Sequence, residues 1–70
     1  MRAFIKSTGC PLCVEFKKHL TKDIEVIDID TQDGMVEYCN STNAMTVPLL
    51  IDGKETFHGQ AAIERLKDAN

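Results

Sequence analysis

The most constraining feature of this chain is a strand, helix and strand pattern at its start, within about 30 residues, the size of a β-α-β unit. Residues 2–6 have an apolar centre and lead into Ser-Thr-Gly, which is typical of a strand that ends in a loop. Pro11 fits a helix only in its first turn, so a helix is expected to begin at Cys10 or Pro11. Residues 24–29 are rich in β-branched side chains, which predicts a second, parallel strand covered on both faces.

A second helix is expected directly after this unit. Its apolar residues at helical spacing are Met35, Val36 and Cys39. Asp30 or Thr31 can cap its N-terminus, and Asn43 suits a left-handed stop at its C-terminal end. Gly34 disfavours a helix at this place. We expect Cys39 on the inner face of the helix, as a small apolar residue rather than a third redox partner.

Asp52-Gly53 is a strong signal for a tight hairpin, because glycine tolerates the positive φ of the turn. It separates residues 47–51 from residues 54–58, which we predict as antiparallel strands. The C-terminal segment is apolar at helical spacing, at Ala62, Ile63, Leu66 and Ala69. The predicted order is therefore β-α-β-α-β-β-α, an α/β fold in which helices flank one four-stranded mixed sheet.

Size and charge limit the classes of function. The 70 residues, 43% of them hydrophobic, suffice for a single domain over residues 1–70 with one modest core. The net charge is -3 and no basic block is present, so we expect no nucleic-acid partner. The first apolar run is far too short for a signal peptide, and no stretch reaches membrane-spanning length. We therefore expect a cytoplasmic monomer with no membrane partner.

Cys10 and Cys13 carry the chemistry that the sequence suggests. Three cysteines, two of them in a Cys-x-x-Cys pair beside a β-α-β pattern, are typical of reactive or metal-binding thiols rather than of a structural disulfide framework. Disulfide exchange needs one thiolate that attacks and a second thiol that resolves the mixed disulfide. The helix N-terminus favours a thiolate at Cys10, which makes it the expected nucleophile. Cys13, one turn further on and closer to the core, is the expected resolving thiol.

Two further interpretations of this region stay open. The ammonium of Lys6 is close enough in sequence to favour the Cys10 thiolate, but an ordinary solvated lysine is an equal alternative. A Cys-x-x-Cys pair also begins zinc sites, although a closed site needs four ligands. The other candidate ligands are Cys39, His19 and His58, without a second paired motif, so we predict no metal site.

Three separated features resemble the glutaredoxin family, the small branch of the thioredoxin-like fold. Cys10-Pro11-Leu12-Cys13 resembles its Cys-Pro-Tyr-Cys active site, Thr46-Val47-Pro48 resembles its Thr-Val-Pro segment, and Gly59 stands where the family has a glycine before the last helix. The resemblance covers essentially the whole chain. It implies a thioredoxin-like fold and a dithiol thiol-disulfide oxidoreductase that reduces protein or glutathione mixed disulfides.

The resemblance also implies a substrate-binding surface around the dithiol. Pro48 would follow a cis peptide bond, and the backbone of Val47 would pair with an extended substrate. The full set of residues that the resemblance places at this surface is Lys6, Leu12, Thr46, Val47, Pro48, Gly59 and Gln60. No bound cofactor is expected, and glutathione enters as a candidate reductant.

Some of these positions depart from the pattern of glutaredoxins that use glutathione. Leu12 replaces the tyrosine of the motif, and Lys6 lies one residue further from the first cysteine than is usual. The family's Gly-Gly segment aligns with His58-Gly59, and Gln60 follows without a carboxylate. The related donors to ribonucleotide reductase, which thioredoxin reductase reduces, carry a Phe-Arg-Pro stretch that this chain lacks. The reductant is therefore open between glutathione and thioredoxin reductase.

Other functions remain as alternatives to this interpretation. One is a glutaredoxin-like donor to ribonucleotide reductase. Another is an iron-sulfur or zinc module in which Cys10 ligates the metal across a dimer, with glutathione as co-ligand. A third is an interaction domain that keeps the fold without catalysis.

Overall fold

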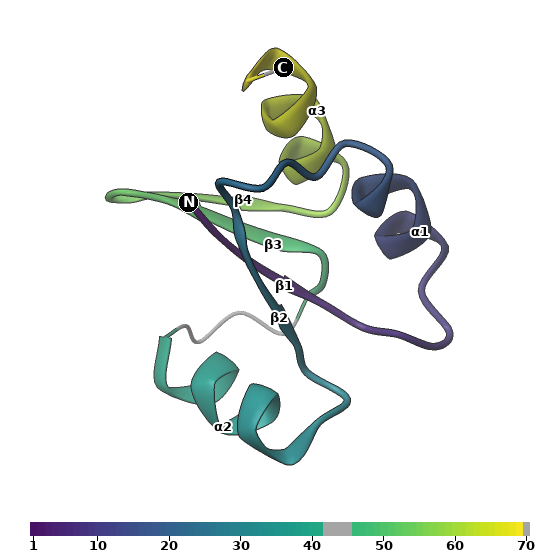
Figure 1. Cartoon of the computed structure of the whole chain (residues 1–70), viewed down its shortest axis with the longest axis vertical. Coiled ribbons are helices and arrows are strands. Elements are labelled where there is room, and N and C mark those ends of the chain that lie inside the picture. Colours follow the sequence, from purple (N-terminus) through teal and green to yellow (C-terminus); the bar gives the residue numbers. More distant parts are fainter. Residues whose placement is uncertain (42–45, 70) are drawn as a thin grey trace.

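The computed structural model describes residues 1–41 and 46–69, so the helix stop predicted at Asn43 lies outside the described residues. The chain order is β1 (Arg2–Ile5), α1 (Pro11–Lys17), β2 (Glu25–Asp28), α2 (Gln32–Ser41), β3 (Leu49–Asp52), β4 (Glu55–His58) and α3 (Gln60–Ala69). The sheet has the strand order β2-β1-β3-β4 (Figure 1). β1 and β2 are parallel, whereas β3 is antiparallel to β1 and to β4. The predicted α/β class, element order and four-stranded mixed sheet are thus confirmed.

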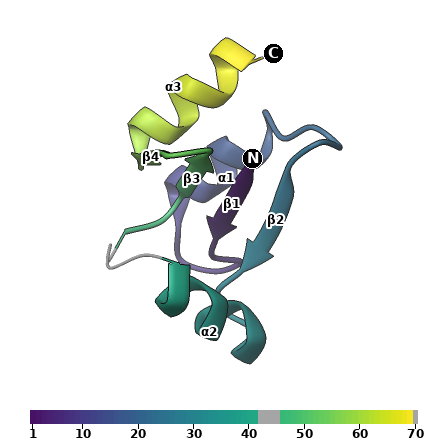
Figure 2. The same ribbon diagram turned by 90° about the vertical axis from the view of Figure 1, so that its left-hand side faces the viewer.

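The helices cover the sheet from both faces, with α1 and α3 on one face and α2 on the other (Figure 1; Figure 2). The central strand β1 explains this division, because successive side chains of a strand point to opposite faces. Ala3 and Ile5 pack in the cluster that includes residues of α1 and α3. Phe4 packs on the other face against Tyr38 of α2, with ring centres 5.3 Å apart. The core is therefore split into two layers by the sheet.

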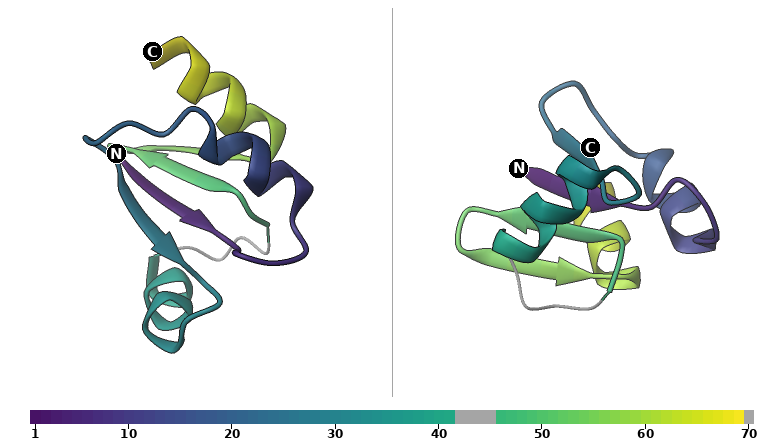
Figure 3. Two further views of the ribbon diagram at one scale, coloured as in Figure 1. Left: turned by 45° about the vertical axis from the view of Figure 1, so that its right-hand side comes forward. Right: turned by 90° about the horizontal axis from the view of Figure 1, so that it is seen from below.

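β2 lies at an edge of the sheet, and the prediction that this strand is covered on both faces is wrong. Glu25 and Val26 are exposed, and 42% of Val26 is accessible. Ile27 does pack on the α2 side of the sheet. On the opposite side α1 and α3 pack against each other, and α3 packs against β4 at the far edge (Figure 3). The two helices therefore leave the edge strand partly uncovered.

α2 turns a different face to the sheet from the one expected. Its buried residues are Gly34 and Tyr38, and Cys39 is exposed, so the prediction of an inward Cys39 is wrong. The reason is a close approach at Gly34, where an added Cβ would lie 2.7 Å from the Asp28 carbonyl carbon and 2.7 Å from Thr31 Oγ1. Thr31 caps the helix and accepts the Gly34 N–H at 2.9 Å, as one of the two predicted caps. The other outward residues of α2 include Met35 and Val36.

The predicted hairpin is confirmed, with a shift of its turn by one residue. Asp52 pairs with Glu55, so the connection is Gly53-Lys54, and Gly53 has the expected positive φ of 62°. The first strand of the hairpin begins at Leu49 rather than at residue 47. Residues 46–48 instead form an irregular segment, and this segment lies beside the cysteine pair.

Candidate functional site

Cys10 and Cys13 form a disulfide at the start of α1. The chain leaves β1 and passes through Gly9, whose φ of 66° lies in the left-handed region that glycine tolerates. Cys10 is the N-cap residue of α1 with an extended backbone, and Pro11 follows at the start of the helix, as predicted. The carboxyl end of β1 and the amino end of α1 thus present the pair together.

The two sulfur atoms have unequal surroundings. Cys10 is half-buried, whereas Cys13 has 0% exposure and belongs to the core shared by α1 and α3. Cys10 Sγ accepts the backbone N–H of Cys13 at 3.1 Å, so it acts as the helix cap in place of a hydroxyl or carboxylate. Cys13 Sγ accepts the backbone N–H of Lys6 at 3.5 Å. A reagent from solvent therefore reaches Cys10 more easily than Cys13.

The peptide bond between Val47 and Pro48 is cis, as the resemblance implied. Pro48 is fully buried, and Val47 is half-buried and packs against both core layers. The Val47 carbonyl oxygen lies 4.0 Å from Cys10 Sγ. In the disulfide this sulfur carries no proton, so the distance records proximity rather than a hydrogen bond. The fold thus brings residues 47–48 next to the dithiol.

Three contacts hold residues 46–48 in place. The hydroxyl of Tyr38 in α2 donates to the Thr46 carbonyl at 2.8 Å, and Thr46 Oγ1 lies 3.0 Å from His58 Nδ1 at the end of β4. The N–H of Gly59 donates to the Pro48 carbonyl at 2.9 Å. Sequence reasoning missed Tyr38, because a single tyrosine in a helix gives no local signal for a bond to a distant loop. These contacts fix the segment on the side of the dithiol.

Leu12 and Gly59 also meet at the dithiol. Leu12 is 41% exposed, and a Cβ added at Gly59 would lie 3.8 Å from Leu12 Cδ1. Gly59 has a φ of 55°, and its carbonyl accepts the N–H groups of Ala62 and Ile63 in the first turn of α3. Gln60 is exposed, and its side-chain amide donates to Glu64 of the same helix at 3.0 Å. Gln60 therefore follows Gly59 in the chain, but its side chain bonds to a residue of its own helix.

Lys6 has a different side-chain partner from the one considered in the sequence. Its ammonium lies 3.8 Å from Asp30 Oδ1, just beyond the end of β2. The other carboxylate oxygen of Asp30 accepts the backbone N–H and the hydroxyl of both Ser7 and Thr8, at 2.8 to 3.3 Å. Asp30 was predicted only as a helix cap, a place that Thr31 takes. The sequence did contain a signal for this contact, because parallel strands end at the same sheet edge and bring their following loops together.

Hydrogen bonding keeps Asp30 ionised. The Ser7 hydroxyl is the largest cause that lowers the pKa of Asp30 below 3.8, followed among the lowering causes by the Ser7 N–H, the Lys6 ammonium and the Thr8 N–H, while partial desolvation opposes them. Because the pKa is lowered in the folded state, this stabilisation is present above the unfolded value of 3.8. It is lost as the pH falls through the lowered pKa. Near neutral pH the loop therefore keeps a charged acceptor.

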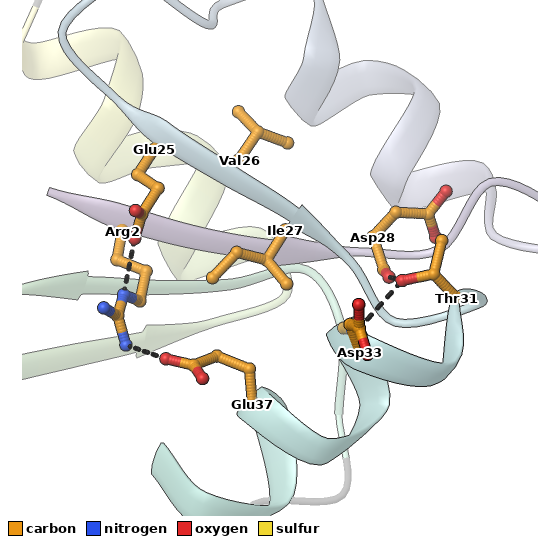
Figure 4. A pocket seen from close by; sticks show the side chains of 9 residues that line it. Arg2, Glu25, Val26, Ile27, Asp28, Thr31, Asp33 and Glu37 are labelled. Atoms are coloured by element: carbon orange, nitrogen blue, oxygen red, sulfur yellow. Dashed lines mark hydrogen bonds and ion pairs between the residues drawn. The ribbon is translucent and has the colours of Figure 1, made fainter.

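An open cavity of about 410 Å³ lies elsewhere, between β2 and α2 (Figure 4). Arg2 spans it and bonds with Glu25 and Glu37, each at 2.8 Å. Its lining residues are Arg2, Glu25, Val26, Ile27, Asp28, Thr31, Asp33, Gly34 and Glu37. None of the residues predicted for the dithiol site lines this cavity.

Residues 1–41 and 46–69 lack two further kinds of feature. Within them, no three His, Cys, Asp or Glu side chains gather in a way that could hold a metal ion. The helices described there also include none with the length and apolar content needed to cross a membrane. The chain was compared with models of protein families, with curated proteins and with solved structures, and none of these matches it.

Proposed function

We propose that this chain is a dithiol thiol-disulfide oxidoreductase of the glutaredoxin kind, with a thioredoxin-like fold. The observation that carries the proposal is the unequal placement of two bonded sulfurs at the start of α1. Cys10 is half-buried and its Sγ accepts the Cys13 N–H at 3.1 Å, whereas Cys13 is fully buried. The cis bond before Pro48 and the closeness of Val47 to Cys10 add to this support.

The proposed reaction has two exchange steps. In the reduced protein the Cys10 thiolate attacks one sulfur of a substrate disulfide, forms a mixed disulfide and expels the other sulfur as a thiolate. Cys13 then loses its proton to solvent and attacks Cys10 Sγ, which expels the substrate thiolate and forms the Cys10–Cys13 disulfide. The substrate gains two electrons, and an external thiol or reductase returns two electrons to the protein.

The surroundings of Cys10 favour its role as the attacking group. A backbone N–H aimed at a sulfur stabilises the thiolate more than the thiol, because the bond is stronger when the acceptor is charged. Cys13 N–H occupies this place at 3.1 Å. The Lys6 ammonium pairs with Asp30, so we assign the activation mainly to the backbone of α1.

The pH dependence of Cys10 alkylation tests this proposal. We expect the rate with iodoacetamide to rise with a midpoint clearly below about 8.5, the pKa of a free thiol. The reduced protein should carry Cys39→Ser, because Cys39 is exposed and would react as well. Cys10→Ser in the same background is the control for residual labelling. A midpoint at or above the value of a free thiol would contradict an activated Cys10.

The proposed substrates are disulfides of proteins or of glutathione that approach Cys10 along residues 47–48. The geometry around the site supports glutathione only in part. Leu12, between the two cysteines, lies close to Gly59, but the Lys6 ammonium is held by Asp30 and the Gln60 amide by Glu64. A donor role toward ribonucleotide reductase is a further proposal within the same chemistry. The cytoplasmic location and the monomeric state stay predictions.

Reduction of the oxidised protein separates the two candidate reductants. One reaction contains glutathione with glutathione reductase and NADPH, and the other contains thioredoxin reductase with NADPH. The loss of NADPH absorbance measures electron flow to Cys10–Cys13 in each. Cys10→Ser serves as the control in both, since it cannot form the disulfide. If NADPH is consumed in neither reaction, the Cys10–Cys13 disulfide is not a substrate of either reductant system, and this would argue against both candidate reductants.

A further inference from the structure

The loop before Cys10 is anchored by a residue from another strand. β1 and β2 are parallel, and their pairing continues one residue beyond β2, where the Ile29 N–H donates to the carbonyl of Ile5, the last residue of β1, at 2.9 Å. Asp30 follows Ile29, two residues after the end of β2. Its carboxylate therefore stands at the same sheet edge as the loop that runs toward the dithiol.

The contacts of Asp30 converge on this loop. Oδ2 accepts the N–H and hydroxyl of Ser7 at 3.0 and 2.8 Å, and those of Thr8 at 3.2 and 3.3 Å. Oδ1 lies 3.8 Å from the Lys6 ammonium. In the part of the chain that the structure describes, no second side chain bonds to Ser7 or Thr8. The loop is exposed, so this one carboxylate provides its side-chain anchor.

The same loop is linked to both cysteines. It runs through Gly9 directly into Cys10, and the Lys6 backbone N–H donates to Cys13 Sγ at 3.5 Å. A displacement of the loop would therefore change the distance and angle between the two sulfurs. Resolution of a mixed disulfide is an intramolecular step, and its rate depends steeply on such geometry.

We propose that Asp30 is a positioning residue for the dithiol: it holds the loop that carries Cys10 and it neutralises the ammonium of Lys6. This inference rests on the proposed function, because it concerns the exchange steps at Cys10 and Cys13. Asp30 touches neither sulfur and acts through Lys6, Ser7 and Thr8. Its charge pairs with the Lys6 ammonium, which would otherwise be a free cation four residues before Cys10 in the chain.

Several other charged or titratable groups around the site also have partners. Next to Asp30 itself, Asp28 Oδ1 accepts the Asp30 N–H at 2.9 Å. On α1, Glu15 pairs with Lys18 and lies 3.6 Å from His19. On β4, His58 lies within bonding distance of Thr46. On α3, Glu64 accepts from Gln60 and lies 4.0 Å from Lys67. Among these ion pairs, the one between Lys6 and Asp30 includes the residue closest to Cys10 in the chain. Replacing Asp30 removes the partner of the Lys6 ammonium.

Ellman's reagent measures the two exchange steps without a known biological substrate. The Cys10 thiolate attacks the reagent's disulfide and releases one thionitrobenzoate. Cys13 then attacks Cys10 Sγ, releases the second thionitrobenzoate and forms the Cys10–Cys13 disulfide, while its proton goes to solvent. All proteins carry Cys39→Ser, because the exposed Cys39 would add a release of its own.

We expect Asp30→Ala to slow the second release by about tenfold, because the loop loses its anchor. Asp30→Asn should restore most of that rate, since an amide oxygen accepts the same bonds. It should also lower the pH midpoint of the first release by a few tenths of a unit, because a negative charge is removed and Lys6 is left unpaired. Asp23→Asn makes the same change of charge at an exposed site before β2 and should alter neither step.

The role of Asp30 would be overturned by two results together: a second release in Asp30→Ala as fast as in Asp23→Asn, and an unchanged pH midpoint of the first release in Asp30→Asn. These results would leave the proposed function intact. A parent protein that releases only one thionitrobenzoate would overturn the proposed function, and this inference with it. Circular dichroism shows whether Asp30→Ala is folded. If it is not, the midpoint for Asp30→Asn decides, because that variant keeps an acceptor for the loop.

Discussion

Cys13→Ser is expected to attack disulfides through Cys10 and then to stop at the mixed disulfide. The reason is that Cys10 remains half-buried with its cap bond, while the buried group that would resolve the adduct no longer contains sulfur. Turnover on a protein disulfide should fall by about 100-fold or more, because resolution then depends on an external thiol. With Cys39→Ser also in place, mass spectrometry after a pulse of oxidised glutathione should show one glutathione on Cys10. Adducts formed in a cell extract would identify protein substrates.

Two variants control this experiment. In a Cys39→Ser background, Cys10→Ser should form no adduct and show no turnover, because Cys13 has 0% exposure and cannot replace the attacking sulfur. Cys39→Ser should behave as the parent protein, since its thiol is exposed on α2 and takes no part in the disulfide. An unchanged turnover in Cys13→Ser would instead show that the second cysteine has no role in the reaction.

Gly34→Ala is expected to destabilise the protein by about 3 kcal/mol, although alanine is the better helix former. A Cβ at this position would lie 2.7 Å from the Asp28 carbonyl carbon and from Thr31 Oγ1. Both atoms belong to the tight connection between β2 and α2, so the helix must move away from the strand. Such a movement would also loosen the contact of Tyr38 with Phe4. Urea unfolding followed by circular dichroism measures the difference in the free energy of unfolding.

Asn40→Ala is the matched control on the same helix. Asn40 is exposed, so the substitution raises helix propensity without a close contact. It should leave the free energy of unfolding unchanged or raise it by a few tenths of a kcal/mol. An equal effect of the two variants would contradict the argument that the Asp28 carbonyl requires glycine at position 34.

Much of the fold could be predicted from local patterns. Pro11 identified the start of α1, Gly53 identified the hairpin, and the apolar spacing of residues 62–66 identified α3. These signals are local because each depends on what one residue's backbone can adopt or on which face of one element is apolar. The position of the cysteine pair at the start of a helix followed from the same kind of signal.

Which faces of the helices and strands are buried was predicted less well. Cys39 was expected inside and is exposed, and the strand predicted over residues 24–29 was expected to be covered, whereas β2 lies at the edge. In α2 the apolar spacing pointed to one face, but the backbone contact of Gly34 with Asp28 fixed another. Such a contact depends on which strand end lies beneath the helix, and no window of sequence contains that information.

The sequence by itself determined the order of the elements, the cysteine pair at a helix start and the turn of the hairpin, because backbone conformations of proline and glycine and the periodicity of apolar residues act over a few positions. Only the tertiary structure decided that β2 lies at the edge, that Cys13 is buried while Cys10 is half-buried, and that Val47 lies 4.0 Å from Cys10 Sγ. It also decided that Lys6 pairs with Asp30 across two parallel strands. These features depend on strand pairing between residues far apart in the chain, and pairing is set by the packing of the whole core.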